Sequence, residues 1–108
     1  MMTLKDKKCV PCEGGTKAYD EQETVRMLKE VPGWSVQNNR LYKEFEFKDF
    51  LANMKFINKV VELAESEGHH PDFCVHYNKT RFEIWTHAID GLSENDFILA
   101  AKIDQLQD

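Results

Sequence analysis

The sequence predicts an α+β domain in which three helices pack on one face of a four-stranded antiparallel sheet, in the order α-β-β-α-β-β-α. Two pairs of segments with alternating apolar residues are each joined by a two-residue loop, which is typical of β-hairpins. Three other segments repeat apolar residues at helical spacing. The 108 residues fit one domain. We expect residues 1–18 to form an N-terminal arm and residues 19–108 to form the domain.

The composition argues against several classes of protein. The formal net charge is −5, and an acidic chain without a basic stripe is a poor nucleic-acid binder. No apolar run approaches the ~20 residues of a membrane span, and Met1 to Lys8 lack the apolar core of a secretory signal. We therefore expect a cytoplasmic protein that binds neither nucleic acid nor membrane.

The arm carries Cys9 and Cys12 in a C-x-x-C pattern. Such a pair can be half of a zinc site or a redox pair. No second C-x-x-C and no βαβ pattern accompany it, and three cysteines give no disulfide framework. We favour an arm without metal or redox chemistry, and the role of Cys9 and Cys12 stays open.

The first helix is predicted from its boundaries. Asp20 and Glu23 have the spacing of a capping box, and acidic residues suit the start of a helix. Val25, Leu28 and Val31 form a short apolar stripe. Pro32-Gly33 ends the helix.

The first hairpin spans Trp34 to Phe47. Asn38-Asn39 suits its turn, because asparagine tolerates the positive φ that a two-residue loop requires. This loop pairs Val36 with Leu41.

The longest helix begins at Lys48 or Asp49 and runs to about Glu67. Gly68 then ends it as a left-handed cap. Its apolar stripe is wide and comprises Phe50, Met54, Phe56, Ile57, Val60, Val61, Leu63 and Ala64. A helix with apolar residues on two sides is expected to pack on the sheet and on a second subunit.

The second hairpin joins residues 72–77 to residues 80–88, with Asn78-Lys79 as the predicted loop. This register places His70 opposite His87, with Cβ atoms roughly 5 Å apart. Alternation puts both histidines and Trp85 on the polar face of the hairpin. The sequence thus predicts that two separated histidine segments meet.

The last helix begins after Ser93, with Asp96 as its capping-box partner. We interpret Asp96 as a helix cap rather than as a catalyst. Leu92 and Phe97 have the spacing of a hydrophobic staple.

The histidines are better placed for proton transfer than for metal binding. Imidazole titrates near pH 6.5 and can act as acid or base near neutral pH. Neighbouring strand residues such as His69 and His70 point to opposite faces and chelate poorly. His76 lies on the order of 20 Å from His70 along a strand and is interpreted as a surface residue. We expect neither a metal site nor a cofactor.

Three other side chains accompany the histidines. Glu65 is either a solvated helix-end acid or a partner for a histidine or an amide-like ligand edge. Trp85 is either a stacking platform beside His87 or part of an interface. Cys74 shares the polar face, but no base stands beside it, so a cysteine nucleophile is not expected.

The histidines belong to a longer pattern. It reads Glu65-x-x-x-His69-His70-Pro71, then Tyr77-Asn78, then Thr86-His87-x-x-x-Gly91-Leu92-Ser93-x-x-Asp96. From about Trp34 to the C-terminus the chain resembles the pterin-4a-carbinolamine dehydratase family, and its cysteine-containing arm is similar to that of microbial members. The resemblance implies a metal-free homodimer or homotetramer. It also implies dehydration of 4a-hydroxytetrahydropterin, the spent product of aromatic amino acid hydroxylases, in tetrahydrobiopterin recycling.

The resemblance also implies roles for individual residues. His69, His70 and His87 would line the pterin site as the catalytic residues. We expect His69 and His87 to act as acids at the 4a-hydroxyl, while His70 binds the ring and takes the N5 proton. Neighbouring imidazoles titrate as a coupled set, so the sequence leaves the division of these steps among the three open.

The remaining family positions would bind or support the substrate. Glu65 would support the histidines or the amide edge of the pterin, and Thr86 and Asp96 would line or support the site. Trp85 would offer its ring to the substrate. Phe73 stands where animal members often have Trp, so the ring contacts there are expected to differ.

A second function remains open. Some animal relatives also stabilise the dimer of a homeodomain transcription factor, so the chain could be a dimerisation module that acts as a transcriptional cofactor. The apolar helix 49–67 could serve such a partner. The microbial character of the arm favours the enzyme.

Overall fold

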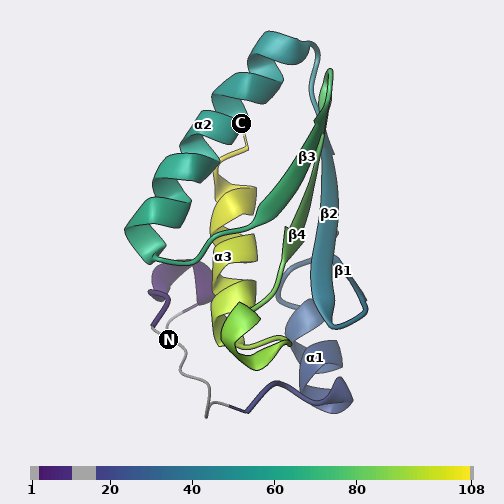
Figure 1. The fold of residues 1–108 in the computed structure, drawn as a ribbon, viewed down its shortest axis with the longest axis vertical. Coiled ribbons are helices and arrows are strands. Elements are labelled where there is room, and N and C mark those ends of the chain that lie inside the picture. Colours follow the sequence, from purple (N-terminus) through teal and green to yellow (C-terminus); the bar gives the residue numbers. More distant parts are fainter. Residues whose placement is uncertain (1–2, 11–16, 108) are drawn as a thin grey trace.

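The α+β fold is confirmed in a computed structural model that describes residues 3–10 and 17–107. A four-stranded antiparallel sheet has the strand order β1-β2-β4-β3, and α2 and α3 lie along one of its faces (Figure 1). Helix α1 lies beyond the end of the sheet, near the β1–β2 loop. The elements are η1 (Leu4–Asp6), α1 (Glu21–Leu28), β1 (Ser35–Gln37), β2 (Arg40–Glu46), α2 (Phe50–Glu67), β3 (Asp72–His76), β4 (Lys79–Ile84), η2 (His87–Ile89) and α3 (Glu94–Gln105).

The first helix begins as the sequence predicts. The Glu23 backbone N–H donates to Asp20 Oδ1 at 2.8 Å, and the Asp20 N–H donates back to Glu23 Oε1 at 3.2 Å. Helix α1 ends at Leu28, and the chain turns before β1. The predicted apolar stripe is only partly buried, because Val31 is inaccessible while Val25 is 53% exposed.

The first hairpin has the predicted register. Val36 pairs with Leu41. Asn38 and Asn39 form the loop with φ of 52° and 61°, the left-handed backbone that asparagine tolerates better than most residues.

The register predicted for the second hairpin is wrong by two residues. Its loop is Tyr77-Asn78, and Phe73 pairs with Phe82. Asn78 is held against the end of β2, since its side-chain amide donates to the Phe47 carbonyl and the Phe47 N–H donates to the Asn78 carbonyl. A shift of two residues keeps every side chain on its predicted face, because the strand period is two.

The longest helix has both predicted ends. Asp49 caps α2 by accepting from the Ala52 N–H at 2.8 Å, and Gly68 ends it with φ of 67°. The buried face consists of Asn53, Phe56, Ile57, Val60 and Ala64. Phe50 and Val61, which the sequence also placed in the stripe, are about half exposed.

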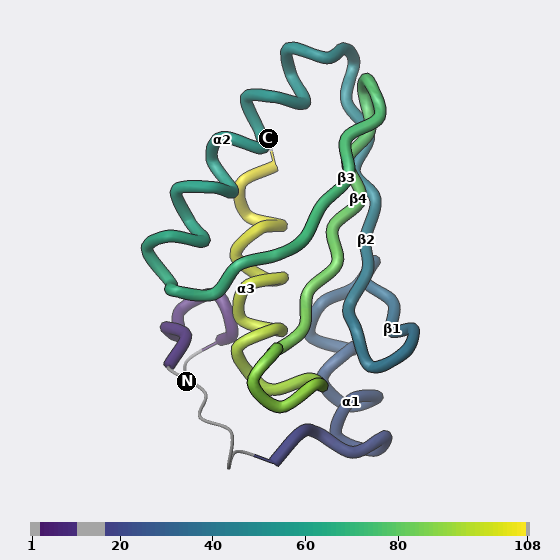
Figure 2. The backbone as a smooth tube through the Cα atoms, viewed as in Figure 1, coloured from purple at the N-terminus to yellow at the C-terminus, as the bar shows by residue number. Residues whose placement is uncertain are grey.

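Helix α3 is the most buried helix among the described residues. Leu92 and Phe97 are buried, as the predicted staple requires, and Ile98, Leu99 and Ile103 are also inaccessible. Figure 2 shows α3 running beside α2, and a contact between His69 and Asp96 joins the turn after α2 to the first turn of α3. This placement brings the capping residues of α3 near the histidine segment.

Nowhere in the described part of the chain is a helix both long enough and apolar enough to cross a membrane.

Candidate active site

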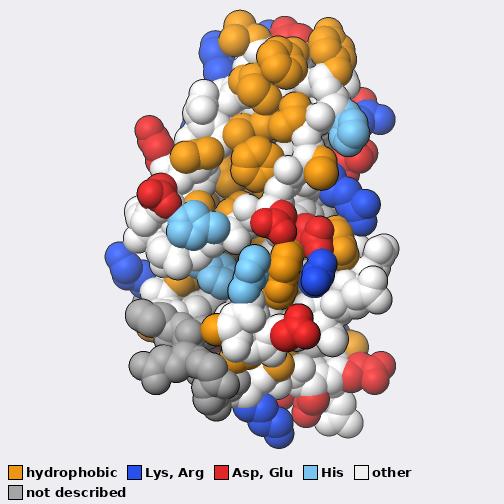
Figure 3. Space-filling view, viewed as in Figure 1, with side chains coloured by type: hydrophobic (Ala, Val, Ile, Leu, Met, Phe, Trp, Pro, Cys, Tyr) orange, Lys and Arg blue, Asp and Glu red, His pale blue; other side chains and the backbone are white. Residues whose placement is uncertain are grey.

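Three histidines from two separated segments line one cavity of about 440 Å³. We call it the histidine pocket, and it is lined by Val10, Gly68, His69, His70, Trp85, Thr86, His87, Ala88 and Asn95. Figure 3 shows histidine side chains gathered on the face that is turned to the viewer. The predicted meeting is thus observed, but not as a strand pair: β3 begins only at Asp72, and His87 lies in η2.

Two tight turns place the histidines at the pocket. Gly68 reverses the chain at the end of α2, so that His69 and His70 follow immediately. The second turn follows β4, where the Thr86 N–H donates to the Gly91 carbonyl at 2.9 Å. This bridge closes a short loop that carries His87 at its start.

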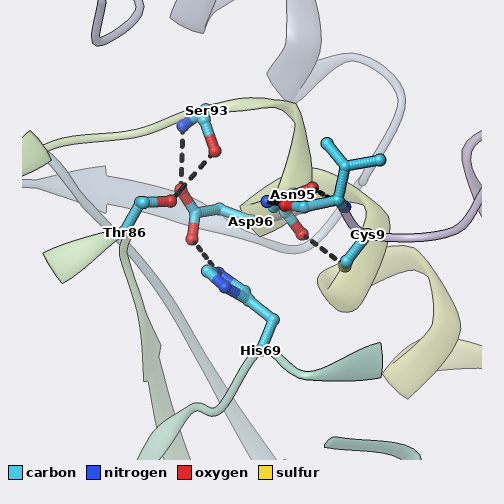
Figure 4. A network of polar contacts seen from close by, with 7 residues as sticks. Cys9, His69, Thr86, Ser93, Asn95 and Asp96 are labelled. Carbon is cyan, nitrogen blue, oxygen red and sulfur yellow. Dashed lines mark hydrogen bonds and ion pairs between the residues drawn. The ribbon is translucent and has the colours of Figure 1, made fainter. Parts of the chain in front are cut away.

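Asp96 holds His69 by a buried hydrogen bond. Asp96 Oδ1 lies 2.6 Å from His69 Nε2, while Oδ2 accepts from Thr86 Oγ1 and the Ser93 N–H, each at 2.8 Å (Figure 4). When the carboxylate is ionised it can only accept, and His69 Nε2 is then the donor of this contact. The contact thereby fixes the orientation of the His69 ring. Asp96 is thus a helix cap, as predicted, and also a histidine partner.

Thr86 and Ser93 complete the environment of this carboxylate. Thr86 Oγ1 lies 2.9 Å from Ser93 Oγ, and both residues are buried. Because the single hydroxyl proton of Thr86 goes to Asp96, the Ser93 hydroxyl must donate to Thr86. Both carboxylate oxygens of Asp96 are therefore engaged, one by His69 and the other by Thr86 and Ser93.

Glu65 is a histidine partner in the structure. Its Oε2 lies 2.5 Å from His70 Nε2, and both side chains are well exposed. Exposed ion pairs contribute only about 0–1 kcal/mol to stability. The contact therefore adds little to stability, and it engages one ring nitrogen of His70, which lines the pocket.

His87 is positioned by stacking. Its ring lies 4.1 Å from that of Trp85, centroid to centroid, at an angle of 15°. The Arg40 Cζ lies 4.0 Å from the centre of the Trp85 ring. Two flat groups cannot share one side of a ring at these distances, so Arg40 and His87 cover opposite faces of the indole. Glu83 fixes Arg40 in turn through an ion pair of 2.7 Å.

One predicted site residue lies away from the pocket. Phe73 was expected to contact the substrate, but it sits in β3 with its ring 5.7 Å from that of Phe82, and it does not line the histidine pocket. Strand alternation turns it to the apolar face. His76, predicted to be a surface residue, is exposed and pairs with Lys79 at the far end of β3.

Sequence reasoning missed Arg40, Asn95 and Val10 as site residues. Arg40 reaches Trp85 because β2 pairs with β4, a long-range contact that neither hairpin specifies. Cys12 lies outside the described residues. Within residues 3–10 and 17–107, no three His, Cys, Asp or Glu side chains are grouped so that they could hold a metal ion.

Comparison with known proteins identifies the family of this chain. The family model described as "Pterin 4 alpha carbinolamine dehydratase" matches residues 17–106, which include all the histidines. The chain belongs to the pterin-4a-carbinolamine dehydratase family. Membership of this dehydratase family indicates a hydro-lyase with a pterin substrate.

Relatives of the dehydratase family match along nearly the whole chain. A protein of Halorhodospira halophila named "Putative pterin-4-alpha-carbinolamine dehydratase" is 48% identical over 107 residues, which cover 97% of this chain and 98% of the relative. An Arabidopsis thaliana protein named "Pterin-4-alpha-carbinolamine dehydratase 2, mitochondrial" is 47% identical over 110 residues, covering 96% of this chain and 59% of the plant protein.

A solved structure shares the fold of the dehydratase family. The crystal structure of a "transcriptional coactivator/pterin dehydratase" from Brucella melitensis superposes with a TM-score of 0.82 at 26% identity, covering 85% of this chain and all of the other.

Proposed function

We propose that the histidine pocket dehydrates 4a-hydroxytetrahydropterin to quinonoid dihydropterin and water. The observation that supports this most directly is the convergence of three imidazoles on one cavity, two of them paired with carboxylates. A cavity of about 440 Å³ falls within the usual range of small-molecule sites and suits a bicyclic heterocycle.

The reaction needs proton transfer and no other chemistry. The C4a–O bond breaks, and the oxygen leaves as water after it takes a proton. The N5–H bond gives up its proton, and the nitrogen electron pair forms the C4a=N5 double bond. One general acid and one general base therefore suffice, and each typically contributes 10²–10⁴-fold.

We assign these roles to the histidine trio. His69 and His87 act as acids at the 4a-hydroxyl, and His70 binds the ring and takes the N5 proton. The Asp96 contact engages Nε2 of His69, so Nδ1 is the atom that exchanges a proton, and His69 acts as an acid from the form that carries a proton on both ring nitrogens. Glu65 orients His70 at the pocket mouth.

Three further roles are proposed for the residues around the trio. Trp85 offers the edge of its stacked ring to the pterin, and Thr86 lines the site while holding Asp96. Phe73 is not among the proposed binding residues of the single chain, because it does not line the pocket. We place the catalytic unit in residues 19–108, with residues 1–18 as an arm.

The biological setting proposed is tetrahydrobiopterin recycling in the cytoplasm. The names of the relatives support a pterin carbinolamine as the substrate. The location is independent of the chemistry, since the Arabidopsis relative is named as mitochondrial.

The test is a stopped-flow assay of 4a-hydroxytetrahydropterin dehydration. The wild-type protein should accelerate the reaction over buffer, and His69→Ala, His70→Ala and His87→Ala should each lower the rate about 10²-fold or more. His76→Ala is the matched control, since it removes an exposed histidine outside the pocket, and should keep the wild-type rate. A wild-type rate equal to that in buffer would remove the proposal.

A second candidate is a protein-binding module. Large apolar side chains that are 36–66% exposed gather on α2 and the β3 hairpin, and they are Phe50, Leu51, Val61, Phe73, Val75 and Tyr77. Figure 3 shows hydrophobic side chains spread over the region of α2 and β3, above the group of histidine side chains near the centre of the view. We propose that this apolar patch joins copies of the chain into a homodimer or homotetramer.

The alternative is that a transcriptional partner protein binds the patch. The Brucella melitensis protein of similar fold is described as a transcriptional coactivator as well as a pterin dehydratase. A double variant with His70→Ala and His87→Ala separates the two functions. An enzyme loses turnover in this variant, whereas a binding module retains its partner.

A further inference from the structure

The N-terminal arm is built into the histidine pocket. Leu4 and Cys9 are buried, and Val10 lines the cavity beside the histidines. The arm lies against the start of α3, where Lys7 pairs with Glu94 at 2.8 Å. The segment that we call the docked arm, residues 4–10, therefore forms one wall of the site.

Asn95 clamps the backbone of this arm. The Val10 N–H donates to Asn95 Oδ1 at 3.0 Å, and Asn95 Nδ2 donates to the Val10 carbonyl at 2.5 Å. The Cys9 thiol adds a contact of 3.5 Å to the Asn95 carbonyl (Figure 4). The amide thus pairs with both polar groups of one backbone residue, as a neighbouring strand would. Asn95 also precedes Asp96, the partner of His69.

Glu67 provides a second anchor. Its Oε1 accepts from the Cys9 N–H at 2.8 Å, and its Oε2 accepts from Lys102 Nζ at 2.7 Å. Burial alone would raise the pKa of Glu67, but the bonds from Lys102 and Cys9 lower it below its ordinary value, so the carboxylate stays charged. Glu67 is the last residue of α2, directly before the turn to the histidines.

We propose that Asn95 and Glu67 are positioning residues that hold the docked arm as a wall of the pocket, and that Val10 on this arm sets how tightly the site retains its substrate. The substrate class, a reduced pterin, rests on the proposed function. The docking of the arm does not. Because Val10 carries no titratable group, losing its contact changes substrate binding rather than proton transfer.

Cys9 provides a readout of arm docking that is independent of activity. Burial raises the pKa of the Cys9 thiol to about 12, and the scarce thiolate should react slowly with 5,5′-dithiobis(2-nitrobenzoate). In a background with Cys12→Ser and Cys74→Ser, Cys9 is the only thiol. Asn95→Ala should then accelerate labelling about tenfold or more, because it removes two hydrogen bonds. Asn58→Ala, at an exposed position of α2, should leave the rate unchanged.

Steady-state kinetics test the effect on substrate. Asn95→Ala should raise KM about tenfold while kcat stays within about threefold. Val10→Ala keeps both backbone hydrogen bonds, and should raise KM severalfold without faster labelling of Cys9. Unfolding curves of each variant show whether the remainder of the fold is intact.

The thiol assay and the kinetic assay test two separate parts of the proposal. Unchanged Cys9 labelling in Asn95→Ala would overturn the clamp, whether or not the protein is a dehydratase. Faster labelling with an unchanged KM would overturn the role of the arm in substrate retention. If the wild-type protein showed no dehydration, the proposed function would fall and the thiol assay alone would decide the clamp.

Discussion

Asp96 shows how one residue can serve folding and the site together. Its spacing from Ser93 predicts a helix cap, and the cap is present. The contact with His69 could not be predicted in the same way, because it depends on the start of α3 lying beside the end of α2. Local spacing reveals local bonds, whereas this contact joins residues 27 positions apart.

Replacing Asp96 tests whether this contact orients His69. In Asp96→Asn the amide nearly keeps the shape of the side chain, but its NH₂ group can no longer accept from His69, so the ring can turn or exchange its tautomer. We expect kcat in the dehydration assay to fall about 10²-fold. The control is Asp72→Asn, an exposed position at the start of β3. A wild-type kcat in Asp96→Asn would show that the contact is only structural.

Arg40 and His87 are linked through the indole between them. Removing the guanidinium in Arg40→Met takes away the cation–π contact with Trp85 and the ion pair with Glu83. We expect kcat/KM to fall about three- to tenfold as Trp85 and His87 become less ordered. Arg81→Met is the matched control, since Arg81 covers the Tyr42 ring at 4.4 Å outside the histidine pocket. Equal losses in both variants would argue against a specific role for Arg40.

At the scale of elements, the sequence predicted each α-helix and each strand, but neither the two short 3-10 helices nor every register. The Asn38-Asn39 loop follows its local preference, because both residues tolerate positive φ. The second loop lies at Tyr77-Asn78 rather than at the predicted Asn78-Lys79, because other elements hold it there. The buried Asn53 side chain of α2 donates to the carbonyls of Tyr77 and Lys79. No pattern within residues 72–88 contains that information.

Asn53 should therefore be important for stability. Besides these two bonds it accepts from the Thr80 hydroxyl, and it is fully buried. Asn53→Ala leaves buried partners unsatisfied, and we expect the free energy of unfolding to fall by about 2–4 kcal/mol. Urea denaturation measures this, with the exposed Asn58→Ala as the neutral control. A loss below about 0.5 kcal/mol would show that water replaces the amide without cost.

For the whole molecule, the pairing of the arm with the end of α2 makes stability depend on pH. Glu67 has a folded pKa below its ordinary 4.5. The stability that it contributes is therefore present above about pH 4.5 and is lost as the pH falls through the lower, folded value.

Removing this charge should destabilise the protein mainly near neutral pH. We expect Glu67→Gln to lower the free energy of unfolding by about 1–3 kcal/mol at pH 7, and by clearly less at a pH below the folded pKa, where the wild-type carboxyl has lost its charge. Denaturation at both pH values measures the difference, and the exposed Glu62→Gln is the control. An equal loss at both pH values would point to packing rather than charge.

The apolar patch and the edge of the sheet together suggest how copies of the chain associate. Among the strands of the described residues, β3 pairs with β4 alone, so its outer edge is open there, and such edges readily pair with another chain. The exposed side chains of α2 lie on the same face. A second copy bound there would cover both features at once, including the exposed apolar residues of α2.

A charge placed in this patch should break the association. Val61 is 46% exposed on α2, and Val61→Glu would bury an unpaired carboxylate in any interface formed there, a cost of several kcal/mol. Light scattering over a range of concentrations should show an oligomer for the wild-type chain and a shift towards monomer for Val61→Glu. Gln22→Glu adds the same charge on α1, outside the patch, and should leave the mass unchanged. A wild-type monomer would contradict self-association, and an intact Val61→Glu oligomer would place the interface elsewhere.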